Sequence, residues 1–149
     1  GLKVFIEVLD ERKVNGIKDI QGKEASPIDD SNDKYERGKE VLEELLQSPL
    51  PETQPQYQQF SSEIDKFLKE HLFADIFERD VLSYQQRELT TVSALIALGN
   101  VEPMLRSHLK ICIIQGFTKK QMEHLVETLK PYLKRKKIKS AKKIIKELE

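Results

Sequence analysis

The sequence predicts an all-α fold, and three observations support this prediction. Apolar residues recur at helical spacing along most of the chain, Gly and Pro separate these segments, and no stretch shows the clear alternation of a strand. The 149 residues fit one domain with a real core, because a chain of about 150 residues buries roughly 70% of its unfolded surface. We therefore expect helices packed around a common apolar centre.

The N-terminal third of the chain contains two predicted helices. The first carries an apolar stripe at i, i+3, i+4 and i+7, made by Leu2, Phe5, Ile6 and Leu9. Residues 15–33, NGIKDIQGKEASPIDDSND, break this period and indicate a connecting loop. A second helix is expected to begin near Asp33 and to bury Val41, Leu42, Leu45 and Leu46.

The middle of the chain begins with a segment rich in proline. Residues 47–56, QSPLPETQPQ, hold three prolines and predict an extended linker. A third helix is expected to follow, with one buried face made by Phe60, Ile64, Phe67 and Leu68. Residues 73–82, FADIFERDVL, indicate a shorter helical or turn-like segment.

The C-terminal half carries clear signals for the ends of helices. A very apolar helix is predicted from about Ser83 to Leu98, and Gly99 ends it. Pro103 suits the first turn of the next helix, which Gly116 closes. The sequence TKKQ, residues 118–121, is a capping box. It opens a helix that Pro131 interrupts and that is expected to bury Met122, Leu125, Val126 and Leu129.

Charge is unevenly distributed, although the net charge is zero. Residues 130–149 contain nine Lys or Arg against two Glu, so the first 129 residues carry the opposite excess. A basic end of this kind can meet nucleic acid or an anionic surface. Apolar residues nevertheless recur there at helical spacing, at Leu133, Ile138, Ala141, Ile145 and Leu148. We therefore expect a packed terminal helix with a solvated lysine face, and no nucleic-acid partner.

The composition argues against several classes of protein. No apolar stretch approaches the roughly 18 to 20 residues that a membrane helix needs, so no membrane partner is expected. The first residues lack the features of a signal peptide, which makes the cytoplasm the default location. The single cysteine excludes an internal disulfide and a thiolate metal cluster. Neither zinc-ligand spacing nor a glycine-rich phosphate loop is present, so no metal is expected.

Two polar residues fall on faces that should be buried. Glu88 shares a helical face with Val92, Leu95 and Ile96. His108 belongs to a stripe completed by Leu105, Leu109 and Cys112. The turn GNVE, residues 99–102, is short enough to make the two helices antiparallel neighbours. We expect Glu88 and His108 to meet, because a buried carboxylate and imidazole need a partner.

Such a pair has two interpretations. Pairing shifts pKa values and can supply a general acid or base near neutral pH. Alternatively, a Glu–His or Glu–Arg pair simply locks two helices together. Arg87 is ambiguous, because it lies beside Glu88 but points toward Thr91 and Ala94. Cys112 is expected to be a small core residue rather than a nucleophile.

A longer stretch around these residues resembles a known family. Residues 73–126, FADIFERDVLSYQQRELTTVSALIALGNVEPMLRSHLKICIIQGFTKKQMEHLV, closely resemble the carboxymuconolactone decarboxylase family. The matching features are Phe73 to Arg79, Leu82, Arg87 to Leu89, Gly99, His108, and Gly116 with Thr118. Residues 35–46, YERGKEVLEELL, are similar to the family's upstream helix, so the resemblance covers roughly residues 33–129.

The resemblance implies a fold, an assembly and a chemistry. The fold is the all-α fold of alkyl hydroperoxidase D-like proteins, which form trimers or hexamers built from trimers. The peroxidase branch has a Cys-x-x-Cys where this chain has NVEPMLRSH, residues 100–108. The missing cysteines disfavour peroxidase activity, so decarboxylation is the leading function. Peroxidase activity and a non-catalytic oligomeric binding module are the two alternatives to it. The decarboxylase branch needs no cofactor and acts on a small lactone bearing carboxylates, as in aromatic catabolism.

The resemblance also implies roles for four residues and a division of the chain. His108 would move the proton with Glu88 orienting it, and Arg79 or Arg87 would bind a substrate carboxylate. An ion pair that Arg87 or Glu88 makes with another helix is the competing structural role. Residues 1–32 resemble the last helix and linker of a preceding repeat in tandem members. Residues 33–149 would then form the decarboxylase-like domain, with an added basic C-terminal helix.

Overall fold

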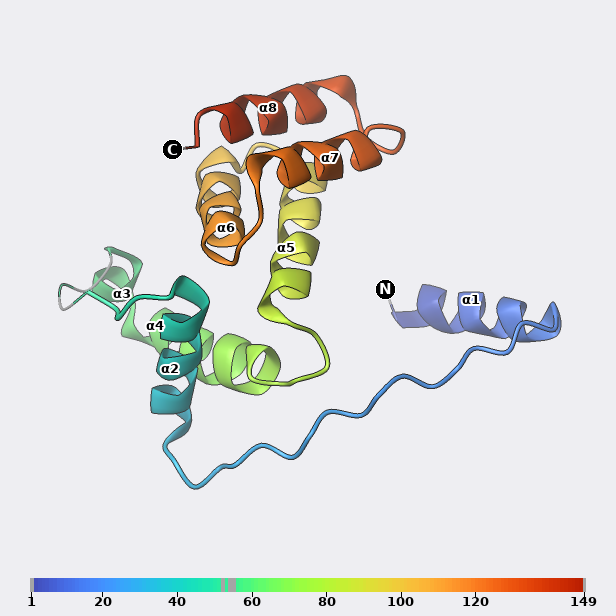
Figure 1. The fold of residues 1–149 in the computed structure, drawn as a ribbon. Helices are drawn as coiled ribbons and strands as arrows, with labels where there is room; N and C mark the ends of the chain where they lie inside the picture. Colours follow the sequence, from blue (N-terminus) through green and yellow to red (C-terminus); the bar gives the residue numbers. More distant parts are fainter. Residues whose placement is uncertain (1, 52, 54–55, 149) are drawn as a thin grey trace.

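The structure is a computed structural model that describes residues 2–51, 53 and 56–148, and every regular element in this part of the chain is helical (Figure 1). The all-α prediction is therefore confirmed. In chain order the elements are α1 (Leu2–Val14), α2 (Lys34–Leu46), α3 (Gln56–Phe60), α4 (Ser62–Phe67), the π-helix η1 (Leu68–Phe77), α5 (Tyr84–Leu98), α6 (Glu102–Ile114), α7 (Lys119–Leu129) and α8 (Arg135–Lys146).

The larger of two apolar cores lies between α5, α6, α7 and α8 (Figure 1). We call it the α5–α8 core. Its buried residues come from all four helices, namely Val92, Leu95, Ile96, Leu105, Leu109, Cys112, Met122, Val126, Ile138, Ala141, Ile144, Ile145 and Leu148. The basic terminal helix is therefore packed, as predicted, and its apolar face closes this core.

The predicted helix ends in this half are confirmed. Ser83 and Thr118 cap α5 and α7, and each forms a capping box with the glutamine three residues on. Gly99 ends α5 with a φ of 70°, a conformation that side chains disfavour. Pro103 lies in the first turn of α6, where its missing N–H loses no helical hydrogen bond. These local signals fix where α5 and α6 turn back on one another.

A second, smaller core joins α2 to η1. Val41, Leu45 and Phe77 are its buried apolar residues. The two backbones come unusually close at Gly38, where a Cβ atom would lie 1.9 Å from the carbonyl oxygen of Lys69. Only glycine permits this approach, so Gly38 sets the distance between α2 and η1.

The predicted third helix differs from the structure in two ways. Ser61 has an extended backbone and caps α4, so the segment divides into α3 and α4 rather than forming one helix. The predicted buried face is also wrong, because Phe60, Ile64 and Phe67 are exposed. Asp65 and Lys69 are buried in their place. Their mutual pairing lets the polar side of the segment pack against α2, which periodicity of apolar residues does not reveal.

The N-terminal segment stands apart from both cores (Figure 1). α1 forms where it was predicted, but none of its residues is buried within the described part of the chain. The following loop is held at Ser26, whose N–H and hydroxyl donate to Asp80 at 2.9 and 2.7 Å. The proline-rich linker is non-helical at residues 48–51 and 53, and its residues 52, 54 and 55 lie outside the described residues. No described helix has the length and apolarity needed to span a bilayer.

Candidate functional site

Glu88 and His108 meet between α5 and α6, as the sequence predicted. The His108 Nδ1 atom lies 2.8 Å from Glu88 Oε2. The Glu88 side chain is 0% exposed, whereas that of His108 is 28% exposed. Glu88 lies on the face of α5 that also buries Val92 and Leu95, so its carboxylate enters an apolar environment. One end of the pair is therefore sealed, and the other reaches the surface.

The hydrogen bond determines how the imidazole is presented. A carboxylate can only accept, so the bond places a hydrogen on Nδ1 of His108. Nε2 is then the nitrogen left to exchange a proton with another molecule. A carboxylate that orients a histidine through Nδ1 is the arrangement found in general acid–base sites. The pair thus has the geometry of a positioned proton donor or acceptor.

Part of the Glu88 carboxylate is unpaired. Its Oε1 atom is buried and has no hydrogen-bond partner among the described residues. Burial, together with the nearby charge of Glu88, raises the pKa of the Cys112 thiol to about 12. Cys112 is therefore the small core residue that was expected, and it does not ionise at neutral pH. The unpaired Oε1 atom of Glu88 is a buried hydrogen-bond acceptor, and leaving it unpaired costs free energy. Such a cost is unusual for a pair that only stabilises the fold.

Arg79 and Arg87 form a second group of polar residues. Arg87 donates to the backbone carbonyl of Arg79 at 2.8 Å, and its guanidinium lies 5.4 Å from the centre of the Phe77 ring. Its Nε atom is buried without a hydrogen-bond partner among the described residues. Burial and the charge of Arg79 lower the pKa of Arg87. The positive charge of Arg79 therefore acts on Arg87, and an anion bound near both would relieve this repulsion.

The structure separates the four predicted residues into two pairs. Hydrogen bonds join Glu88 to His108 and Arg87 to Arg79, and among the described residues none joins one pair to the other. The Glu88–His108 contact joins α5 to α6, so it also fits the competing role of a pair that locks two helices together. Arg87 uses a backbone carbonyl rather than a carboxylate. Sequence reasoning missed the Phe77 ring beneath Arg87, although the aromatic segment that contains it was recognised.

Other candidate groups are not assembled into a site. His71 and His124 are exposed. Among the described residues no cluster of three or more His, Cys, Asp or Glu side chains is placed to hold a metal ion. The polar chemistry of α5 and α6 therefore rests on Glu88, His108 and the two arginines.

Comparison with known proteins identifies the family of the chain. Residues 62–147 match the model of the Carboxymuconolactone decarboxylase family, a range that includes both polar pairs and α8. A 4-carboxymuconolactone decarboxylase from Acinetobacter baylyi (strain ATCC 33305 / BD413 / ADP1) is 29% identical over 94 residues. That alignment covers 62% of this chain and 69% of the relative. The match spans more than half of the chain, and the protein belongs to the carboxymuconolactone decarboxylase family.

Proposed function

We propose that this protein is a cofactor-free lyase that removes carbon dioxide from a small carboxylated lactone, or performs related proton transfer. The observation that carries this proposal is the buried 2.8 Å hydrogen bond between Glu88 and His108. It supplies an oriented imidazole in the part of the chain that matches the family. The named activity of the Acinetobacter relative supports the same chemistry.

His108 is the proposed catalytic residue, and Glu88 holds its tautomer. In the proposed reaction the carbon–carbon bond to the leaving carboxylate breaks, and its electron pair passes into the unsaturated lactone ring. His108 carries a second proton on Nε2, taken up from solvent, and gives this proton to the ring carbon; solvent then restores it. General acid–base catalysis of this kind contributes about 10²- to 10⁴-fold.

The arginine pair is the proposed binding site for a substrate carboxylate. A guanidinium binds a carboxylate through two parallel hydrogen bonds. Arg87 has a buried, unpaired Nε, and the exposed Arg79 guanidinium adds a second charge. A bound carboxylate would give Arg87 Nε a partner and neutralise the repulsion between the two cations.

Two alternatives make different use of the same fold. A thiol-dependent peroxidase needs a reactive thiolate, but Cys112 is buried and its pKa is raised to about 12. A non-catalytic oligomeric binding module would keep the fold without using His108. The unpaired Oε1 of Glu88 favours the enzyme over this module, because a structural site is better served by a fully bonded or apolar pair.

We also propose a homo-oligomer, a trimer or a hexamer. Large apolar side chains are exposed on α1 and on the segment α3–η1, including Phe5, Phe60 and Phe67. Exposed apolar surface of this kind marks association. Light scattering on the full chain measures the assembly directly.

Residues 1–32 are proposed to be a separate element, related to the end of a preceding repeat. This element precedes the domain formed by residues 33–149.

The test is decarboxylation of γ-carboxymuconolactone, followed by ultraviolet absorbance. We expect turnover by the native protein and its loss in His108→Gln, with circular dichroism showing an intact fold. His124→Gln is the matched control, because His124 is exposed on α7 and should be dispensable. No turnover by the native protein, or equal turnover in His108→Gln, would refute the proposal.

A further inference from the structure

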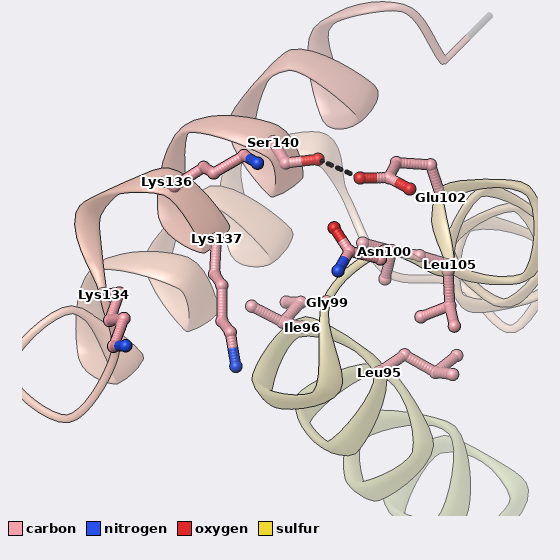
Figure 2. Close-up of a pocket in the computed structure, with 11 residues that line it drawn as sticks. Leu95, Ile96, Gly99, Asn100, Glu102, Leu105, Lys134, Lys136, Lys137 and Ser140 are labelled. Carbon is pink, nitrogen blue, oxygen red and sulfur yellow. Dashed lines mark hydrogen bonds between the residues drawn. The ribbon is translucent and has the colours of Figure 1, made fainter.

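A cavity of about 150 Å³ lies where α5 ends and α6 begins. It is enclosed by the end of α5, the turn into α6 and the first half of α8 (Figure 2). Leu95, a lining residue, is seven positions after Glu88, which is about 10 Å along a helix. On α6 the lining reaches Leu105, one helical turn before His108, but none of the four proposed site residues lines the cavity.

The floor of the cavity is apolar. It is made by Leu95, Ile96, Val101 and Leu105, which come from α5, the turn and α6. A protein cavity of about 150 Å³ with similar apolar walls is large enough to bind benzene. The space therefore suits one ring or a branched group of comparable size, and not a long chain.

The rim of the cavity is positively charged. Lys134, Lys136 and Lys137 line it from the α8 side, and Figure 2 shows Lys137 extending toward Ile96 and Gly99. The Lys137 ammonium donates to the backbone carbonyl of Ala97. The Lys134 and Lys136 side chains form no hydrogen bond or ion pair with a described residue. Neither ammonium is therefore neutralised by a described side chain, and Figure 2 shows Lys136 directed toward Ser140.

The backbone adds to this positive character. Val101 and Lys134 are the N-cap residues of α6 and α8, both line the cavity, and neither cap makes a side-chain hydrogen bond to its helix. The helices α2, α5 and α7 are capped by Asp33, Ser83 and Thr118. Free backbone N–H groups at a helix start favour an anion. The only opposing charge in the lining of this cavity is Glu102, which accepts from the Ser140 hydroxyl at 3.1 Å.

We propose that this cavity is a binding site for a compact organic anion, a carboxylate carried on an apolar body about the size of one ring. The apolar body would occupy the floor, and the carboxylate would lie at the rim beside Lys134 and Lys136. The apolar floor and the cationic rim select this ligand together. An uncharged ring would lack the attraction to the lysines, and a small carboxylate without a ring would lack the contacts with the apolar floor.

The experiment is a chemical-shift titration of the full chain by nuclear magnetic resonance, with benzoate as the probe. Acetate lacks the ring and benzyl alcohol lacks the charge, so these two compounds separate the contributions. The double variant Lys134→Gln/Lys136→Gln removes the rim charges. Its matched control is Lys139→Gln/Lys146→Gln, which removes two exposed lysines of the same C-terminal segment that do not line this cavity.

We expect saturable benzoate shifts centred on Leu95, Val101 and Leu105, with weaker binding of acetate and benzyl alcohol. The rim variant should weaken benzoate binding about 2- to 20-fold, the sum of two exposed charge contacts. The control variant should leave it nearly unchanged. Glu102→Gln should strengthen binding about twofold, because it removes the one opposing charge.

Several results would overturn the proposal. These are the absence of saturable shifts at millimolar benzoate, equal weakening in both lysine variants, or equal binding of benzyl alcohol. Shifts centred on His108 and Arg87 would place benzoate in the proposed catalytic site instead. Failure of this titration leaves the decarboxylation assay unaffected, because none of the varied residues belongs to that site.

Discussion

Two buried polar pairs in this molecule have similar ingredients and different surroundings. Asp65 and Lys69 are each 3% exposed, and Glu88 is 0% exposed beside His108. The first pair lies one helical turn apart within α4 and η1, whereas the second joins α5 to α6. Both place a carboxylate away from water. The hydrogen bonds that each carboxylate accepts therefore show how far the cost of its burial is offset.

The Asp65 carboxylate is fully bonded. One oxygen accepts from the Lys69 ammonium, and the other accepts from the Tyr35 hydroxyl at 2.6 Å and the Gln58 amide at 2.9 Å. In Glu88 one oxygen accepts from His108, and the other has no partner among the described residues. A satisfied network stabilises and rigidifies a fold, whereas an unsatisfied buried atom needs another explanation. The difference fits a structural role for Asp65 and the proposed catalytic role for Glu88.

The largest expected effect is on activity at the Glu88–His108 pair. Glu88→Gln should lower kcat for γ-carboxymuconolactone by about 10²- to 10⁴-fold, because an amide can favour the wrong tautomer of His108. The free energy of unfolding in urea should change little, since the replaced carboxylate was only half bonded. A fall in stability with unchanged kcat would make the pair structural and erase the contrast with Asp65.

Stability should respond most at the Asp65–Lys69 pair. Lys69→Met leaves Asp65 as a buried carboxylate without its cation, which should lower the free energy of unfolding by about 3 to 5 kcal/mol. Lys66→Met is the matched control, because Lys66 is one turn away and its side chain is 60% exposed. Urea unfolding of both variants provides the measurement. A similar fall in the free energy of unfolding in Lys69→Met and Lys66→Met would show that the buried Asp65–Lys69 pair stabilises the fold no more than an exposed lysine does.

The same pair predicts a pH dependence with a definite sign. Burial raises the pKa of Asp65, but hydrogen bonds from Lys69, Tyr35 and Gln58 more than offset this and lower it below its ordinary value. The unfolded chain therefore binds a proton at higher pH than the folded chain does. The stabilisation is complete above the unfolded pKa of about 3.9 and is lost as pH falls through the folded value.

That pH dependence is measured as a difference between two proteins. The gap in free energy of unfolding between the native protein and Asp65→Asn should be constant near neutral pH. It should narrow as the pH falls below about 4. Other carboxylates also titrate in this range, but they do so in both proteins and cancel. A gap that stays constant down to acid pH would contradict the assigned role of Asp65.

Sequence periodicity anticipated one of these pairs and missed the other. Glu88 and His108 interrupt clear apolar stripes, so their burial followed from the residues beside them. Around Asp65 the visible stripe was Phe60, Ile64 and Phe67, and it is the exposed side. The buried side depends on the close approach of α2 at Gly38 and on Tyr35, which is 30 positions away from Asp65. Such tertiary pairing leaves no local pattern.

The same reasoning applies to the arginines. The resemblance to the family singled out Arg79 or Arg87 as the residue that binds a carboxylate, but it did not indicate how Arg87 is held. Its support is a backbone carbonyl and the face of an aromatic ring, and neither partner is specific enough to be recognised in a sequence. Helix ends, in contrast, depend on neighbouring residues, and the predicted capping box at Thr118 is present.

The smallest expected effect concerns one hydrogen bond of the satisfied network. Tyr35→Phe removes the 2.6 Å bond to Asp65 but keeps the ring, whose centre lies 4.8 Å from the Lys69 ammonium. Asp65 keeps Lys69 and Gln58, so the free energy of unfolding should fall by only about 1.5 kcal/mol. Tyr132→Phe, at an 81% exposed position, is the control and should have no measurable effect. A loss as large as that of Lys69→Met would mean that Asp65 tolerates no missing partner, and the unpaired oxygen of Glu88 would then require a bound molecule all the more.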